Sequence, residues 1–242
     1  MAYIYILEIN EFSKKRICEN VQLLSLERQI KINKYKFLKD SYRSFISGLL
    51  VRYAICTILN CKNKDLIFDS TLYGKPFVKV QGKEIVHFNL SHSGKYVVCA
   101  IDNYECGIDV ECSDNFDVET AKNIFHYHEV MQLNKCINDE EKYKYLNFLW
   151  TMKEAYVKAI GVGLSKSLSS FYVDKKDKNV SIVDSDKESI IFNVAKNIEI
   201  DEKYSMSFVG NSAEIIFFRL NDIQLLDNIK DLYKYKKYYG II

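Results

Sequence analysis

The chain has 242 residues, of which 48% are hydrophobic and 27% are charged, and its formal net charge is only +2. These values are typical of a globular protein that buries a core without disulfide bonds or structural metals. They exclude an overall charge that would attract nucleic acid or a membrane surface, so we expect neither as a partner.

Seven cysteines, an odd number without a C-x-x-C pair, indicate free thiols and a reducing compartment. Cys56, Cys61 and Cys99 stand in apolar surroundings and are expected to be buried. The N-terminus has no basic lead-in, and no apolar run approaches the roughly 20 residues of a membrane helix. We therefore expect a cytoplasmic protein, and a monomer.

The first half of the chain opens with an alternating pattern that predicts a strand at residues 3–9. A helix is expected from Ser13 to Ser25, and a basic segment with aromatic residues follows at 28–39. Asp40 is expected to cap a long helix that ends near Leu59. Short strands separated by glycines are predicted at 66–68, 77–80, 85–90 and 95–101.

The second half repeats this order. A strand at 104–111 precedes a helix from about Val118 to Cys136 and a longer helix from Glu140 to Ile160, which ends before Gly161. A closing helix is expected from Asp222 to Tyr239. Strands are predicted between these helices near 168–173, 180–183, 188–194, 203–209 and 213–219.

Two successive strand–helix–helix–strand patterns predict an α+β fold made of two similar, pseudo-symmetric halves. The boundaries are residues 1–103 and 104–220, and residues 221–242 form a C-terminal tail. No Gly-, Ser- or Pro-rich linker separates the halves, so we expect them to pack tightly. An active site is expected in the seam, where such sites commonly form.

The acidic strand Gly107–Glu111 is the strongest candidate for chemistry. Asp109 and Glu111 are two residues apart, so both carboxylates project from one face of the sheet, which is costly without a cation between them. A solvated acidic face is the alternative. In the helical stretch 150–159, Glu154 and Lys158 lie one turn apart and could join the strand pair. Three carboxylates are hard oxygen ligands of the kind that Mg²⁺ prefers.

Three further patterns remain open. His92 stands between two serines at a strand end, where it is either an ordinary histidine or a phosphate ligand. A serine hydrolase would need a G-x-S-x-G turn, which the sequence lacks there. Tyr73–Pro76 is a turn with one lysine. The basic segment 28–39 is typical of a solvated surface or, less often, of a nucleic-acid patch.

Together these segments resemble the motifs of the 4′-phosphopantetheinyl transferases, in particular the longer Sfp-type enzymes. The resemblance spans residues 1–220 and implies two α+β halves with coenzyme A bound between them. It implies transfer of the 4′-phosphopantetheine arm to a serine of an apo acyl or peptidyl carrier domain, with release of 3′,5′-ADP, for nonribosomal peptide or polyketide synthesis. The motifs are Tyr73-Gly74-Lys75-Pro76, Asn89-Leu90-Ser91-His92-Ser93-Gly94, Gly107-Ile108-Asp109-Val110-Glu111 and Trp150-x-x-Lys153-Glu154-Ala155-x-x-Lys158.

The resemblance also implies roles for individual residues. Asp109, Glu111 and Glu154 would hold Mg²⁺, with Mn²⁺ as an alternative, and Lys158 would add positive charge at the reacting phosphate. Glu129 stands where the family has a glutamate proposed to accept the serine proton, a water on the metal being the alternative. The catalytic set is therefore Glu129, Lys158, Asp109 and Glu154. The coenzyme A set is Arg28 and Lys31 at the 3′-phosphate, with Arg43, Tyr73, Gly74, Lys75, Pro76, Asn89, Ser91, His92, Asp109 and Lys158.

Two rival functions are a Mg²⁺-dependent phosphohydrolase or nuclease and a non-catalytic carrier-binding module. The first would be expected to carry more acidic residues and a stronger basic surface, and the intact carboxylates argue against the second. For a transferase, the near-neutral net charge predicts mainly apolar docking of the carrier. The expected surface is the helix 118–136, which carries Ile124, Phe125, Val130 and Leu133, with Phe125 and Val130 at its exposed edge.

Overall fold

The computed structural model of the chain describes residues 1–80, 84–112, 123–176, 179–184 and 192–234. A six-stranded sheet with the order β11-β1-β5-β4-β3-β2 forms its first half. Neighbouring strands are antiparallel except β1 and β11, which are parallel. The strands are β1 (Ala2–Glu8), β2 (Leu66–Ser70), β3 (Pro76–Val80), β4 (Glu84–Ser93), β5 (Tyr96–Asp102) and β11 (Ile215–Asn221).

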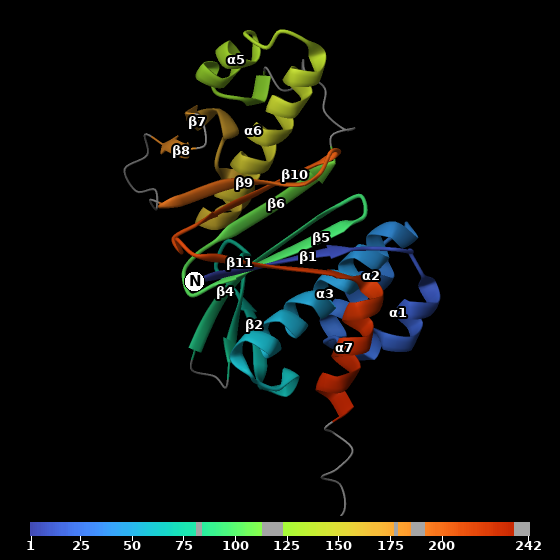
Figure 1. The fold of residues 1–242 in the computed structure, drawn as a ribbon. Helices are drawn as coiled ribbons and strands as arrows, with labels where there is room; N and C mark the ends of the chain where they lie inside the picture. The colour runs from blue at the N-terminus through green and yellow to red at the C-terminus, as the bar shows by residue number, and fades with distance from the viewer. Residues whose placement is uncertain (81–83, 113–122, 177–178, 185–191, 235–242) are drawn as a thin grey trace, which may run out of the picture.

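Helices cover one face of this sheet, and the second half covers the other (Figure 1). The covering helices are α1 (Lys14–Asn20), α2 (Leu26–Lys34), α3 (Leu38–Leu59) and α7 (Asp222–Lys234). In the second half, a three-stranded sheet has the order β6-β10-β9, and β7 pairs with β8 in a two-stranded sheet. Its elements are β6 (Gly107–Cys112), α5 (Tyr127–Leu133), α6 (Asp139–Ile160), β7 (Phe171–Lys176), β8 (Asn179–Asp184), β9 (Val194–Asp201) and β10 (Tyr204–Gly210).

Strand β1 has no charged side chain before Glu8 because both faces of the first sheet are covered. Tyr5 and Leu7 contribute to the core under the helices, whereas Ile4 and Ile6 belong to the core shared with β6 and β10. The seam between the two halves is therefore a packed sheet-on-sheet core, as the absence of a linker predicted.

Helix α3 has the length and composition of a membrane span, contrary to the expectation from the sequence. In this fold 67% of that stretch is buried inside the protein. Phe45, Leu49 and Ile55 are completely buried in the core of the first half. The apolar character of α3 is thus explained by its position between the sheet and the neighbouring helices.

Gly107 lets helix α6 lie directly on strand β6. A Cβ atom at this position would stand 1.9 Å from the carbonyl oxygen of Ala155 and 2.5 Å from the nitrogen of Ala159, so any side chain would push the helix away. The contact places the last two turns of α6, which carry Glu154 and Lys158, beside the acidic end of β6. This glycine therefore determines the geometry of the site.

The mixed α+β class is confirmed, with several local differences from the predictions. Helix α3 begins at Leu38 with Phe37 as its N-cap, so Asp40 lies in its first turn and is not the cap. Residues 168–170 form a 3₁₀ turn, and β9 begins only at Val194, although a strand was predicted near 188–194. The described part of the predicted helix 118–136 is mainly α5. Residues 113–122, 188–191 and 235–242 lie outside the described residues.

The end of the chain returns to the first half. Strand β11, predicted within the second half, pairs in parallel with β1 in the first sheet. Helix α7 contributes Leu225 and Ile229 to the first core, and its buried Asp222 accepts hydrogen bonds from Arg16 (2.6 Å) and Tyr42 (2.7 Å). Residues 215–234 are therefore part of the first half's structure, although they follow the second half in the sequence.

Candidate active site

Strand β4 runs along β6, and polar side chains of β4 supply the hydrogen bonds between the two strands. The other edge of β6 pairs with β10 through the backbone. The contacts recur at every second residue of β4, as the pleat of a strand requires. They join Asn89 Oδ1 to the Ile108 N–H (2.9 Å), Ser91 Oγ to Asp109 Oδ1 (2.7 Å), Ser93 Oγ to Glu111 Oε2 (2.8 Å) and the Cys112 N–H to Ser93 Oγ (3.2 Å).

Lys158 completes the contacts of Asp109. Its Nζ donates to Asp109 Oδ1 at 2.6 Å and to Ser91 Oγ at 3.2 Å. The Asp109 side chain is 3% exposed, whereas that of Lys158 is 28% exposed, so the cation faces solvent more than the carboxylate does. Asp109 Oδ2 is buried and has no hydrogen-bond partner within the described part of the chain. This oxygen is available to a further ligand.

Glu111 and Glu154 are coupled electrostatically to Asp109. Burial raises the pKa of Glu111; the hydrogen bond from Ser93 opposes this shift, and the charge of Asp109 adds to it. Burial also raises the pKa of Glu154, again with a contribution from Asp109. Both shifts are those expected for acidic groups that share a partly dry site.

The three carboxylates do not form a ready-made ligand group within the described residues. Among the residues that the structure describes, no three His, Cys, Asp or Glu side chains form a group suited to hold a metal. The carboxylates repel one another because they carry like charges. Two of them also have separate partners, since Asp109 pairs with Lys158 and Glu111 accepts a hydrogen bond from Ser93. The predicted cluster is thus present as an interacting set of charges, without a shared ligand geometry.

Glu129 lies in the core of the second half and not at the seam. It is 1% exposed, and its Oε1 accepts from Lys153 Nζ at 2.9 Å and from the Val173 N–H at 2.8 Å. Its Oε2 accepts the His126 N–H at 3.0 Å, which closes a capping box at the start of α5. These contacts give Glu129 a structural role in the second half, and its role as the proton acceptor stays a prediction.

Lys153, the partner of Glu129, belongs to the motif around Glu154 but was not among the predicted site residues. Its Nζ also donates to the carbonyl oxygens of Leu168 (2.8 Å) and Phe171 (2.6 Å), and the side chain is completely buried. Burial lowers the pKa of Lys153 to about 8, although the negative charge of Glu129 opposes this shift. The pair ties α5, α6 and β7 together one residue away from Glu154.

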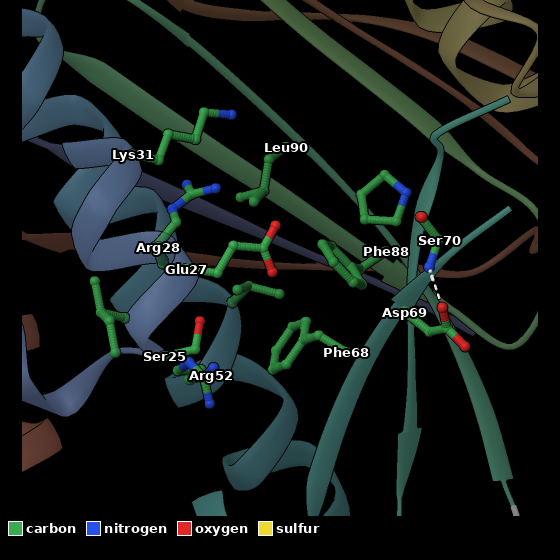
Figure 2. Close-up of a pocket in the computed structure, with 14 residues that line it drawn as sticks. Ser25, Glu27, Arg28, Lys31, Arg52, Phe68, Asp69, Ser70, Phe88 and Leu90 are labelled. Carbon is green, nitrogen blue, oxygen red and sulfur yellow. Dashed lines mark hydrogen bonds between the residues drawn. The ribbon is translucent and has the colours of Figure 1, made fainter. Parts of the chain in front are cut away.

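A cavity of about 380 Å³ lies between helices α2 and α3 and strands β2 to β4. Figure 2 shows Arg28 and Lys31 reaching from α2 toward the strands, which contribute Phe68 and Phe88. Arg28 donates from Nη2 to the Ser44 carbonyl oxygen at 3.0 Å, and burial lowers its pKa. A pocket with aromatic walls and a basic rim is suited to an aromatic ring that carries phosphate.

Of the other residues predicted to bind coenzyme A, some line the cavity and others lie outside it. Pro76 lines the cavity, whereas Tyr73 is 66% exposed on the preceding turn, where Gly74 adopts a φ of +81°. Arg43 joins α3 to the turn after β4 by donating to the Gly94 carbonyl oxygen at 2.8 Å. His92 is exposed beside Arg43 and Lys158, and the surrounding protein and these cations lower its pKa.

Lys75 does not face solvent. The residue is 8% exposed, and its Nζ pairs with Glu105 and donates to the Ala159 carbonyl oxygen at 2.6 Å. This placement differs from the implied contact with coenzyme A phosphates, because the ammonium group is already bound inside the seam. Neither Glu105 nor Ser93 was a predicted site residue. Ser91 and Ser93 are two residues apart, as Asp109 and Glu111 are. This matching spacing could have predicted that Ser93 contacts Glu111 as Ser91 contacts Asp109.

Comparison with known proteins agrees with the motifs. A family model described as "4'-phosphopantetheinyl transferase, N-terminal" matches residues 11–103, and one described as "4'-phosphopantetheinyl transferase superfamily" matches residues 105–209. The 4′-phosphopantetheinyl transferase gsp of Aneurinibacillus migulanus is 37% identical over 165 residues, which is 68% of each chain. The 4′-phosphopantetheinyl transferase Sfp of Bacillus subtilis (strain 168) is 34% identical over 188 residues, covering 77% of this chain and 82% of that protein.

Among solved structures, the holo-[acyl-carrier-protein] synthase of Thermotoga maritima matches with a TM-score of 0.37 and 19% identity. The match covers 45% of this chain and 64% of that chain.

Proposed function

This chain belongs to the 4′-phosphopantetheinyl transferase superfamily and is of the Sfp type, and from the geometry of its site we propose how it holds its substrates. It transfers the 4′-phosphopantetheine arm of coenzyme A to a serine of an apo carrier protein domain and releases 3′,5′-ADP. The observation that supports our assignment of the site is the contact of Lys158 with Asp109 at 2.6 Å, at a place where Ser91 of the first half contacts both side chains across the seam.

We propose that Asp109, Glu111 and Glu154 bind Mg²⁺, or Mn²⁺ in its place. Carboxylate oxygens suit these cations. The buried, unpartnered Oδ2 of Asp109 and the raised pKa values of the two glutamates support the fit, because a cation would stabilise all three charges. When bound, the ion would supply positive charge to the diphosphate and to the leaving phosphate. Lys158, one turn after Glu154 on α6, adds a second positive charge at the same place.

We propose that the nucleotide end of coenzyme A binds in the cavity between α2 and β3. The aromatic walls suit the adenine ring, and Arg28 and Lys31 at the rim suit the 3′-phosphate. Arg43 and Lys158 lie close enough to His92 for their charges to lower its pKa, and we propose that His92 contacts the phosphates. Incubation of apo carrier domains with coenzyme A, with and without Mg²⁺, tests the proposal when the mass of the pantetheine arm on serine is measured.

Dephospho-coenzyme A, which lacks the 3′-phosphate, is expected to be a poorer substrate than coenzyme A. A lost charge-assisted contact costs on the order of 1.5–3 kcal/mol, a tenfold to hundredfold loss in kcat/KM. The Lys31→Met variant should reduce this discrimination, whereas Lys34→Met should not, because Lys34 is exposed on the same helix and does not line the cavity. Equal kinetics with both cofactors would show that the 3′-phosphate binds elsewhere.

The carrier-docking surface predicted around residues 118–136 needs one correction. Phe125 was expected at its exposed edge but is 5% exposed and packs in the second core. The exposed apolar side chains near α5 are instead Tyr127 (63%), Met131 (50%) and Ile137 (88%). We propose that these side chains contact the carrier domain.

Replacing Ile137 by Asp is expected to raise KM for the carrier about fivefold or more, as for an interface residue worth at least 1 kcal/mol. The KM for coenzyme A should not change, and activity should fall only modestly between low and physiological salt. Ile67→Asp is a matched control, because Ile67 is 54% exposed on β2 in the other half. A steep loss of activity with salt, together with no effect of Ile137→Asp, would indicate electrostatic docking elsewhere.

The rival functions find less support. A nuclease or phosphohydrolase would be expected to gather more acidic groups at the site, and a binding module would not need the Lys158 contact with Asp109. We also propose a reducing, cytoplasmic location. The seven cysteines are free, and Cys56, Cys99 and Cys106 are buried.

A further inference from the structure

A partly buried ion pair crosses the seam at the end of helix α6. Lys75, from the turn between β2 and β3, pairs with Glu105, which lies in the connection between β5 and β6. Glu105 also lies 3.3 Å from His87 Nδ1 through its other carboxylate oxygen. Burial disfavours the charged form, yet the hydrogen bonds from His87 and Lys75 outweigh it and lower the pKa of Glu105 to about 2. Glu105 is therefore ionised at neutral pH.

The same lysine holds the C-terminal turn of α6. Its Nζ donates to the Ala159 carbonyl oxygen at 2.6 Å, one of the last carbonyls of the helix, which have no partner within the helix itself. A cation there also interacts favourably with the helix dipole. The aliphatic part of Lys75 covers Gly161, the left-handed C-cap of α6, where a Cβ would stand 2.8 Å from Lys75 Cδ. The fit is close along the whole side chain.

The Lys75 side chain starts from a well-ordered turn. Two hydrogen bonds join Thr71 and Lys75. The Thr71 N–H donates to the Lys75 carbonyl oxygen (2.8 Å), and the Lys75 N–H donates to the Thr71 hydroxyl oxygen (3.1 Å). The Gly74 N–H donates to the Thr71 carbonyl oxygen at 2.9 Å. The position of Lys75 is thus fixed at its backbone and at its ammonium group.

Lys158 immediately precedes Ala159, the residue that Lys75 holds. Any shift of this last turn moves the Lys158 ammonium group relative to Asp109 Oδ1, which it contacts at 2.6 Å. On the other side, Gly107 of strand β6 lies close to Ala155 and Ala159, so the strand packs directly against the same turn. The helix end is therefore held from both halves of the protein.

We propose that Glu105 is a positioning residue for the transfer reaction, because it fixes Lys75 on the end of α6 and so sets the place of Lys158. The inference rests on the proposed site and gives Lys75 a different task from the phosphate contact that the family motif implies. The two tasks predict opposite effects at Glu105. If Lys75 holds the end of α6, loss of the Glu105 charge weakens this contact and impairs the reaction. If Lys75 binds phosphate, loss of the Glu105 charge frees its ammonium group to bind coenzyme A.

The experiment compares Glu105→Gln and Lys75→Met with the wild-type enzyme in steady-state transfer to a carrier domain. We expect both variants to lower kcat by roughly tenfold to a hundredfold, as for a small misplacement of a reacting group, with KM for coenzyme A within about twofold. The double variant should be no worse than Lys75→Met, because both changes remove one interaction. Glu105→Asp, which keeps the charge, should recover part of kcat.

Glu140→Gln is the matched control, because Glu140 pairs with Lys144 on the exposed start of the same helix. It should leave kcat unchanged. A lower KM for coenzyme A in Glu105→Gln, paired with a higher one in Lys75→Met, would overturn the proposal in favour of phosphate binding. Unchanged kcat in both variants, or in Lys75→Arg and Glu105→Asp if the stronger variants unfold, would overturn it too. An inactive wild-type enzyme would count instead against the proposed site and function.

Discussion

Replacing Asp109 by Ala is expected to abolish transfer of the pantetheine arm while the fold remains intact. Asp109 contacts Lys158 and Ser91 and influences the pKa of both Glu111 and Glu154, so it is the central group of the site. If the three carboxylates hold Mg²⁺, the loss is that of the ion's contribution, several kcal/mol, or on the order of a thousandfold in rate. Mass spectrometry of the carrier after a timed reaction measures it.

Stability should hold or rise in the same variant. Asp109 is a buried carboxylate with one unpartnered oxygen beside two further acidic side chains, so its removal relieves both desolvation and repulsion. Lys158 can then pair with Glu154, one turn away on α6. Chemical denaturation measures the free energy of unfolding. Asp139→Ala, in the exposed first turn of α6, is the control for activity and should transfer normally.

Two results would contradict this account. Full activity of the wild-type enzyme in excess EDTA would exclude an essential divalent cation at these carboxylates. Full activity of Asp109→Ala would show that the reacting phosphate binds away from the acidic strand. A merely unfolded variant would be recognised from the denaturation curve and replaced by Asp109→Asn, which keeps the volume of the side chain.

The meeting of Asp109 and Lys158 could be predicted because the periodicity of the strand and of the helix determines the face on which each side chain lies. Residues two apart share a face of a strand, and residues four apart share a side of a helix. The family motifs indicated that the acidic strand and the helix with Lys158 share one site, and Gly107 explains why the two elements lie in contact. The sequence also predicted most strands, because their apolar residues are consecutive or alternate.

The parts that could not be predicted depend on contacts between residues distant in the sequence. Strand β11 joins β1 across more than two hundred residues of chain, at a register such as Tyr5 opposite Phe218, and no local pattern indicates such a partner. Lys75 belongs to a recognised motif, but a motif does not say which way a long side chain turns. Its direction is determined by Glu105 and by the end of α6, which only the fold places beside it.

Glu129 shows the same limit for a buried charge. Its position in the chain matched a functional glutamate of the family, and an acidic residue on a short helix is normally exposed. The structure instead buries it against Lys153, where each of the two charges satisfies the other and the surrounding backbone groups. The two roles make different predictions for stability and for rate.

Replacing Glu129 by Ala is expected to lower the free energy of unfolding by about 3–5 kcal/mol, because it leaves the ammonium group of Lys153 buried without its counter-charge. The His126 and Val173 N–H groups lose their acceptor in the same change. Denaturation with urea measures the loss. The Glu129→Gln variant should lose less, since its amide oxygen can still accept from Lys153 and the volume is unchanged.

The rate separates the structural role from a catalytic one. At a temperature where Glu129→Gln is folded, we expect its kcat to stay within a few-fold of the wild-type value, because the carboxylate is 1% exposed and bonded to groups of its own half. Loss of a general base would instead lower kcat by roughly 10²–10⁴ with little change in stability. Replacing both partners, Glu129→Leu with Lys153→Met, removes the uncompensated charge, so stability should exceed that of Glu129→Ala. A folded Glu129→Gln enzyme with kcat reduced a hundredfold or more would restore Glu129 as the base.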